Sequence, residues 1–140
     1  MKKYFNLLLG TLIACILFSC LNASAISGSL AFMSITLPSS SNNYYLSPTR
    51  TRTSTADPQK YYSGGTVDNF DGKYIDMKAT ICSVDSSGNV INIETITLGT
   101  NEEKSFNSSG GSIFEGKYKV KLSRKNSSLW SATHSGVWTY

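Results

Sequence analysis

Histidine and cysteine are scarce in this sequence, and their scarcity excludes several kinds of site. His134 is the only histidine, so a metal site built from several histidines is excluded. Two of the three cysteines, Cys15 and Cys20, lie in an apolar N-terminal run, which leaves Cys82 alone in the rest of the chain. A single cysteine cannot form an internal disulfide, so we expect the domain to be stabilised by its hydrophobic core.

The motifs that carry enzymatic chemistry are also missing. The sequence has no G-x-S-x-G segment, and no helical pattern follows the paired glycines at 64–65 and 110–111, as a phosphate-binding loop would require. The segment 68–72 is rich in oxygen ligands but lacks the closing glutamate of a calcium loop, so we interpret it as a turn. We interpret His134 as a surface residue. No catalytic residue, metal or cofactor is therefore assigned, and we expect a protein that is not an enzyme.

The first 25 residues have the pattern of a secretory signal peptide. Lys2 and Lys3 precede an uncharged, mostly apolar run over residues 4–21, and Ala23-Ser24-Ala25 supplies the small residues of a cleavage site. The pattern predicts a signal-peptide helix over residues 1–25, cleavage after Ala25, and a secreted domain over residues 26–140. Two alternatives stay open: a lipid on Cys20, which would make a membrane-anchored lipoprotein, or an uncleaved membrane anchor.

Charge is sparse in the secreted part. Removal of Lys2 and Lys3 lowers the formal net charge from +4 to about +2. A charge this small does not indicate a nucleic-acid partner. The remaining length corresponds to one ordinary domain that can bury a core of its own.

Residues 73–99 predict a β-hairpin. Ile75, Met77, Ala79 and Ile81 are apolar at every second position, a turn-forming segment follows at 85–89, and residues 90–98 are rich in β-branched side chains. In the second strand the apolar residues change parity between Ile93 and Ile96. A β-bulge near Glu94-Thr95 would restore the register.

Residues 115–123 form the clearest amphipathic strand in the sequence. Tyr118, Val120 and Leu122 alternate with three lysines at 117, 119 and 121, which predicts that the apolar side chains face a core and the lysines face water. We expect the hydroxyl of Tyr118 to bond a backbone carbonyl near the preceding turn, because a buried phenol needs a partner. The segment resembles the strand of immunoglobulin-like sandwiches that carries the tyrosine corner.

Further short strands are predicted along the chain. Residues 26–37 have apolar side chains in both parities, which indicates a strand buried on both faces and ended by Pro38. Shorter strands are expected at 44–46, 104–107, 129–134 and 136–140. Seven or so strands without a helical pattern predict an all-β fold, a small antiparallel β-sandwich of immunoglobulin-like architecture.

The candidate binding residues are basic or aromatic. Arg50 and Arg52 lie in an alternating segment, 49–57, that we interpret as an exposed edge strand, with a small anion-binding patch as the alternative. Aromatic side chains left outside a core can stack on sugars or pack against a protein. The candidate residues are Arg50, Arg52, Tyr61, Tyr62, Trp130 and Trp138.

Taken together, the signal peptide, the Arg-Thr-Arg-Thr-Ser segment at 50–54 and the Ser-Gly-Val-Trp segment at 135–138 resemble uncharacterised small exported proteins of Gram-positive bacteria. In size, export and aromatic ending the chain is also similar to lactococcin 972-type bacteriocins. The resemblance implies an exported β-sandwich that binds a cell-envelope component or a protein partner, with bacteriocin-like activity as one form. The alternative is a structural cell-surface component that assembles through edge strands.

Overall fold

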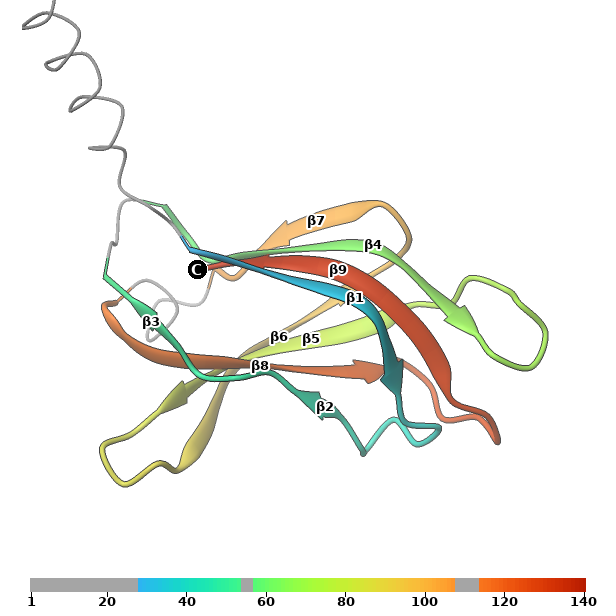
Figure 1. Cartoon of the computed structure of the whole chain (residues 1–140), viewed down its shortest axis with the longest axis horizontal. Helices are drawn as coiled ribbons and strands as arrows, with labels where there is room; N and C mark the ends of the chain where they lie inside the picture. Colours follow the sequence, from blue (N-terminus) through green and yellow to red (C-terminus); the bar gives the residue numbers. More distant parts are fainter. Residues whose placement is uncertain (1–27, 54–56, 108–113) are drawn as a thin grey trace, which may run out of the picture.

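A computed structural model describes residues 28–53, 57–107 and 114–140, and within these ranges every regular element is a β-strand (Figure 1). The signal-peptide helix expected at residues 1–25 lies outside the described residues. Over the described ranges, no helix is long and apolar enough to cross a membrane. The strands are β1 (Ser29–Leu37), β2 (Tyr45–Leu46), β3 (Arg50–Arg52), β4 (Lys60–Asp68), β5 (Met77–Val84), β6 (Val90–Leu98), β7 (Glu102–Ser105), β8 (Gly116–Arg124) and β9 (Ala132–Thr139).

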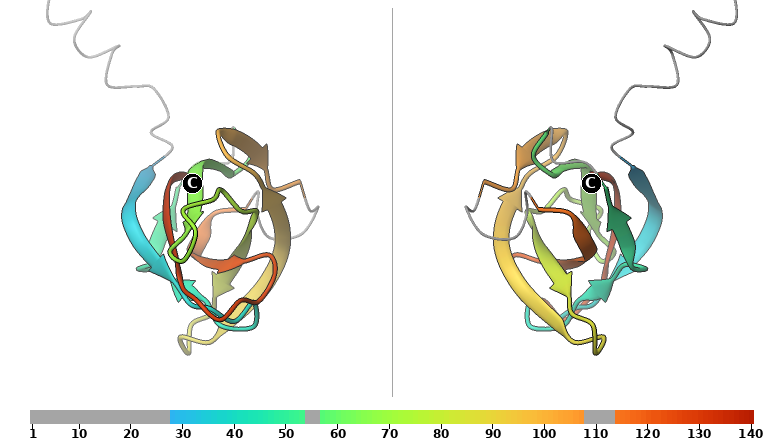
Figure 2. Two further views of the ribbon diagram at one scale, coloured as in Figure 1. Left: turned by 90° about the vertical axis from the view of Figure 1, so that its right-hand side faces the viewer. Right: turned by 90° about the vertical axis from the view of Figure 1, so that its left-hand side faces the viewer.

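The strands form two antiparallel sheets that pack face to face. One sheet, here called sheet A, has the order β1-β9-β4-β7; the other, sheet B, has the order β2-β8-β5-β6, with β3 also paired to β8. Figure 2 shows the two sheets curving around a common interior. The expectation of an all-β, sandwich-like fold is therefore confirmed.

The pairing within the sheets is nested about the turn between β5 and β6. β5 pairs with β6, β4 with β7, β2 and β3 with β8, and β1 with β9. The chain thus behaves as one long antiparallel ribbon folded over on itself. Two further pairings, β4 with β9 and β5 with β8, join the folded ribbon into the two sheets.

Side chains from the inner faces of both sheets fill the core. Because successive residues of a strand point to opposite faces, each strand contributes alternate residues. The buried hydrophobic cluster contains Phe32, Leu37, Tyr61, Met77, Ala79, Ile81, Leu98, Phe106, Tyr118, Val120, Leu122, Ala132 and Trp138. The predicted alternation in β5 and β8 is confirmed by this set.

The Tyr118 hydroxyl has the partner that the sequence predicted. Tyr118 is 3% exposed, and its hydroxyl donates a hydrogen bond of 2.9 Å to the carbonyl oxygen of Phe114, just before β8. The bond satisfies the polar end of a ring that is otherwise packed in the core. It also fixes the entry of the chain into β8.

The predicted bulge in β6 is confirmed at the residue before the expected position. Ile81 pairs with Glu94 and Cys82 with Asn92, so Ile93 has no partner on β5. The extra residue brings Ile96 and Leu98 to the inner face, opposite Ala79 and Met77.

The prediction for residues 26–37 was wrong in one respect. β1 is an edge strand, and Met33 is 84% exposed, so the strand is not buried on both faces. Its apolar residues occupy both parities because the register shifts between Phe32 and Ile35. Ser34 adopts a left-handed φ of 54° at this shift.

Candidate functional site

Two of the predicted binding aromatics, Tyr61 and Trp138, are core residues. Both are 0% exposed, and the indole nitrogen of Trp138 donates a 3.1 Å hydrogen bond to the side-chain oxygen of Gln59. Their burial corrects the prediction, because a ligand at the surface cannot reach either ring. Tyr62, the neighbour of Tyr61 in β4, points outward, and its hydroxyl donates to Asn101.

Arg52 is also buried, contrary to the interpretation of an exposed edge strand. β3 does lie at an edge of sheet B, but Arg50 pairs with Tyr118 and Arg52 with Gly116, and paired residues share a face. Both arginines therefore lie on the inner side. Arg52 is 3% exposed and donates to the carbonyl oxygen of Asp57, while burial lowers its pKa. Arg52 is thus held within the fold and does not form a surface patch for anions.

His134 is buried as well, so its interpretation as a surface residue was wrong. The hydroxyls of Tyr61 and Thr66 each lie 2.8 Å from one of its two ring nitrogens. The approach is close because Gly136 has no side chain: a Cβ there would lie 2.9 Å from both the imidazole Nε2 and the Tyr61 hydroxyl. Burial lowers the pKa of His134 to about 4. The imidazole is therefore a hydrogen-bonded core group and is not available as a general base.

Trp130 is, with Tyr62, one of the two predicted binding aromatics that lie open to solvent. It is 51% exposed and belongs to the loop between β8 and β9, outside the strand that the sequence predicted at 129–134. Its ring stacks on that of Phe70 with 5.3 Å between centroids and 10° between planes. Phe70 lies in the loop between β4 and β5 and is 70% exposed. Two loops thus present a stacked aromatic pair at one end of the sandwich.

Arg124, the last residue of β8, links the two loops that carry this pair. Its guanidinium donates to the carbonyl oxygen of Trp130 at 2.6 Å and to the carboxylate of Asp68 at 2.5 Å. The same carboxylate accepts a 2.9 Å hydrogen bond from the amide of Phe70. This amide, followed by Arg124, lowers the pKa of Asp68. One buried arginine and one aspartate therefore position both rings.

Asn69 ties the same loops together on the other side. Its amide nitrogens donate to the backbone carbonyl and hydroxyl of Ser131 at 3.1 and 2.9 Å, and its side-chain oxygen accepts from Thr133 at 2.8 Å. Buried or paired polar groups thus hold both loops, and with them the aromatic pair, in a defined arrangement.

Asn69, which precedes Phe70 in the chain, also lines a groove of about 400 Å³. One wall is Tyr74, which is 66% exposed and lies against Gly65. A Cβ at Gly65 would lie 2.8 Å from the Tyr74 ring, so this position requires glycine, as does its φ of 151°. Thr133 and Ser135 add hydroxyl groups to the groove. We call Asn69, Phe70, Tyr74 and Trp130 the aromatic loop site.

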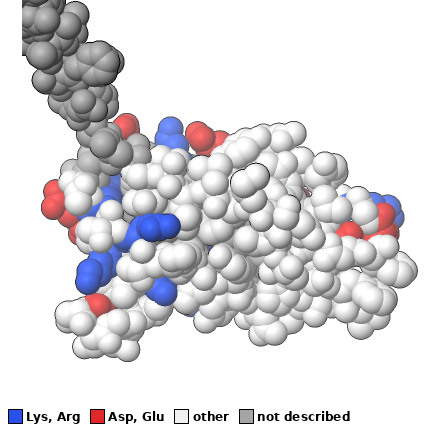
Figure 3. Space-filling view, in the orientation of Figure 1, with Lys and Arg blue, Asp and Glu red and all other residues white. Residues whose placement is uncertain are grey.

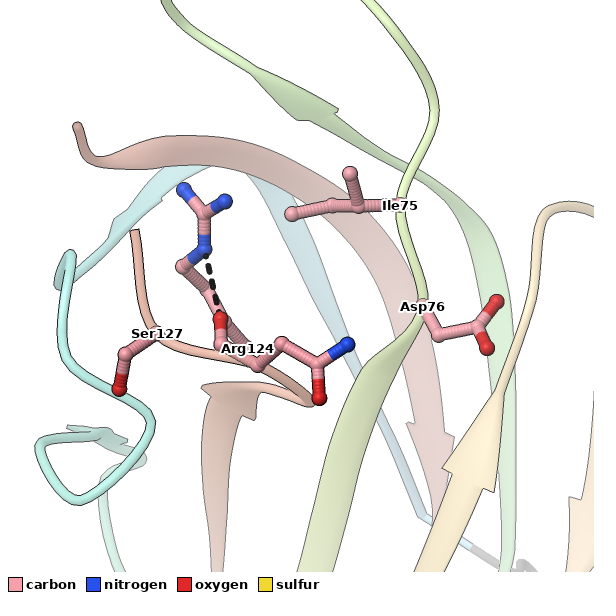
Figure 4. Close-up of a pocket in the computed structure, with 5 residues that line it drawn as sticks. Ile75, Asp76, Arg124 and Ser127 are labelled. Carbon is pink, nitrogen blue, oxygen red and sulfur yellow. Dashed lines mark hydrogen bonds between the residues drawn. The ribbon is translucent and has the colours of Figure 1, made fainter. Parts of the chain in front are cut away.

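A second pocket, of about 270 Å³, lies on the other side of Arg124 (Figure 4). Figure 4 shows the Arg124 side chain between Ile75 and Ser127, with its Nε bonded to the carbonyl oxygen of Asn126. Asp76 points away from the arginine and pairs with Lys125 at 2.9 Å. The pocket therefore has an apolar wall from Ile75 and polar groups from the loop.

Exposed rings beside amide and hydroxyl groups have the chemistry to contact a ligand with an apolar face and hydroxyl groups, such as a sugar ring. In the described part of the chain, no group of three acidic, cysteine or histidine side chains is placed to hold a metal ion. The acidic residues of segment 68–72 instead pair with neighbouring basic groups, Asp68 with Arg124 and Asp71 with Lys73.

Comparison with family models, curated proteins and solved structures found no match for this chain.

Sequence reasoning missed Phe70, Tyr74 and their supports, Asp68 and Arg124. A usable signal was present, because Phe70 lies inside an Asp/Asn/Gly turn. Such turns run over the surface, so an aromatic ring within one is exposed. No sequence signal connects this turn with Trp130, which lies sixty residues further along the chain.

Proposed function

We propose that the protein is an exported, non-enzymatic binding protein that acts at a cell surface and recognises a glycan of the cell envelope through the aromatic loop site. The observation that carries the proposal is the stacked, exposed pair of Phe70 and Trp130, held by Arg124 and Asp68. Exposure of large apolar ring faces to water is unfavourable, so two such rings held together on fixed loops indicate an interaction site.

A glycan fits the groups around the pair. Sugar rings present apolar C–H faces that can stack on Trp130, Phe70 or Tyr74, and hydroxyls that can bond Asn69, Thr133 and Ser135. The proposal of a non-enzymatic protein is supported by His134, whose two ring nitrogens already face hydroxyls within the core. Bacteriocin-like inhibition of related cells is one consequence such binding could have.

The test is binding of the purified exported protein to isolated cell envelopes and to a panel of neutral glycans. Loss of a stacking ring costs about 1–3 kcal/mol in comparable aromatic platforms, so Trp130→Ala should weaken binding roughly 5- to 150-fold. The matched control is Phe114→Ala, which removes an aromatic ring that is 56% exposed. Phe114 precedes the start of β8, whereas Trp130 follows the end of this strand. The control should bind as the unaltered protein does.

Two results would overturn the proposal. The first is an unaltered protein that binds neither envelopes nor glycans and does not inhibit related cells. The second is an equal loss of binding in Trp130→Ala and Phe114→Ala, which would mean that aromatic exposure in general, and not the aromatic loop site, accounts for the binding.

We also infer that the architecture is a jelly roll in place of the immunoglobulin-like sandwich expected from sequence. Immunoglobulin sheets place consecutive strands side by side, as A and B in the order ABED. Here sheet A has the order β1-β9-β4-β7, and the pairing is nested about the β5–β6 turn, which is the rolled ribbon of a jelly roll. Jelly rolls include lectin domains, an analogy that agrees with a glycan ligand without establishing it.

Assembly through edge strands stays an alternative prediction. The edge strands β1 and β6 are long, but each carries a bulge, and bulges at edges oppose sheet extension. Sedimentation over a wide concentration range distinguishes the two functions, because polymerisation would favour assembly and a constant monomer mass would favour binding.

A further inference from the structure

The described lysines fall into two groups according to their ion pairs. Lys60, Lys73, Lys104 and Lys125 each lie within an ion pair with an aspartate or glutamate. The other four lysines in the described part of the chain make no ion pair. All the aspartates and glutamates of the sequence lie in this described part. These four are Lys78, Lys117, Lys119 and Lys121.

The four unpaired lysines share the outer face of sheet B. In β8 the buried residues Tyr118, Val120 and Leu122 alternate with the lysines, which places Lys117, Lys119 and Lys121 on the outer face. Lys78 alternates with Met77 and Ala79 in the neighbouring strand β5. Positive charge without local compensation is thus concentrated on one side of the molecule. Figure 3 shows Lys and Arg side chains gathered over β3 and the first part of β8.

Polar side chains in regular rows surround these lysines. Across β8, β5 and β6, the outward rows are Ser123–Lys78–Thr97, Lys121–Thr80–Thr95 and Lys119–Cys82–Asn92. The hydroxyls of Thr80 and Thr95 bond each other at 2.7 Å. The face therefore offers hydroxyl, amide and ammonium groups, and its rows contain no carboxylate.

This outer face of sheet B contains a groove of about 260 Å³. The groove is lined by Ser41, Asn42, Tyr44, Lys78, Thr80, Asn92, Thr95, Lys121 and Ser123. Lys121 is fixed within it, because its ammonium donates to the side-chain oxygen of Asn92 at 2.7 Å and lies 4.6 Å from the centre of the Tyr44 ring. Every polar lining side chain can donate a hydrogen bond, and two are cationic.

We propose that this outer face of sheet B, here called the lysine face, binds an anionic glycan whose repeating units carry phosphate or carboxylate groups. The unpaired ammonium groups meet the anionic groups, and the hydroxyl and amide groups of the groove meet the sugar hydroxyls. A nucleic acid fits less well, because non-specific single-strand binding uses several free aromatic platforms. Tyr44 is the aromatic residue that lines the groove, and it already lies against Lys121.

This inference rests on different residues from the aromatic loop site and is tested separately. The probes are glycosylated poly(glycerol phosphate), polygalacturonate, neutral dextran, and a single-stranded DNA oligonucleotide of matched charge. The unaltered protein should bind one or both of the first two more tightly than dextran and DNA. Binding should weaken steeply as salt is raised, because it is electrostatic. Comparison of the two anionic glycans distinguishes phosphate from carboxylate as the recognised group.

The decisive variant is the triple substitution Lys78→Gln, Lys119→Gln and Lys121→Gln. A lysine near a polyanionic surface contributes about fivefold in affinity, so the triple variant should bind roughly 100-fold more weakly. The matched control is Lys60→Gln, Lys104→Gln and Lys125→Gln, which removes the same charge from ion-paired positions. It should keep most of the affinity.

Three outcomes would overturn the inference: no binding of either anionic glycan, equal losses in the two triple variants, or binding of the DNA as tight as that of the glycans. Equal losses would mean that net charge alone attracts the polymer. Trp130→Ala serves as a separate control. If it loses neutral-glycan binding but keeps anionic-glycan binding, the lysine face acts independently. If Trp130→Ala and Phe114→Ala lose neutral-glycan binding equally while the anionic glycans still bind, the proposed function of the aromatic loop site fails and the inference about the lysine face is retained.

Discussion

Between about pH 7 and pH 4.5, above the range in which most carboxylates titrate, acid should destabilise this fold chiefly through His134. The imidazole is 0% exposed, and burial lowers its pKa from 6.5 to about 4 in the folded state. In the unfolded chain the histidine titrates near its ordinary value of about 6.5. Between these two values the unfolded chain binds the proton and the folded protein does not. The contribution of His134 to the free energy of unfolding should therefore be constant above about pH 6.5 and fall as the pH is lowered toward about 4.

The size of the loss follows from the difference between the two pKa values. Each unit corresponds to about 1.4 kcal/mol, so the full contribution is about 3 kcal/mol, and about 2.5 kcal/mol of it should be lost by about pH 4.5. A domain of this size has about 5–15 kcal/mol in total. The loss is therefore large enough to move the urea midpoint clearly.

Urea unfolding between pH 7 and pH 4.5 tests the prediction, with His134→Gln as the matched variant. Glutamine does not titrate, so the variant should be less stable at pH 7 but lose less stability on acidification. Because the chain has a single histidine, the imidazole proton signals of an untagged protein can be followed directly by NMR. An equal loss in the two proteins, or an imidazole that titrates near pH 6.5 in the folded state, would refute the reasoning.

Two further predictions concern the core and the N-terminus. Tyr118→Ala removes a buried ring and its bond to Phe114, and should lower the free energy of unfolding by about 3–5 kcal/mol. The matched change Lys119→Ala lies on the outer face and should alter it by less than about 0.5 kcal/mol; comparable losses in denaturant melts would contradict the assigned strand faces. Mass spectrometry of secreted protein should find Ile26 at the N-terminus. A lipid on Cys20 would instead indicate a membrane-anchored lipoprotein.

Local patterns in the sequence predicted the strands that carry a regular alternation. The alternation of Tyr118, Val120 and Leu122 with lysines predicted which side chains of β8 face the core. The change of parity after Ile93 indicated the bulge in β6. These features depend on the covalent geometry of a strand, in which neighbours point to opposite faces. The order of the strands could not be derived in this way, because it depends on pairings between distant segments, such as Ser29 with Thr139.

In the candidate site, too, some features follow from local sequence patterns and others depend on contacts between distant segments. Tyr61 and Tyr62 are adjacent in β4, a strand that was not predicted from the sequence. Neighbours in a strand point to opposite faces, and their burial shows that Tyr61 points inward. His134 lies in the same parity as Ala132 and Trp138, and this alternation could have identified it as buried. By contrast, Arg52 faces inward although it is charged, and its acceptor at Asp57 is a backbone carbonyl, which no residue pattern reveals.

The nested pairing has a consequence for when the protein can fold. β9 lies between β1 and β4 in sheet A, so the sheet cannot close before β9 has been synthesised. A nascent chain that has not yet reached β9 lacks the strand that joins β1 to β4. Contacts between such distant segments make folding slow, in the range of milliseconds to seconds. If the protein is exported as proposed, this delay would keep the chain unfolded while it crosses the membrane, and the sandwich would form on the far side.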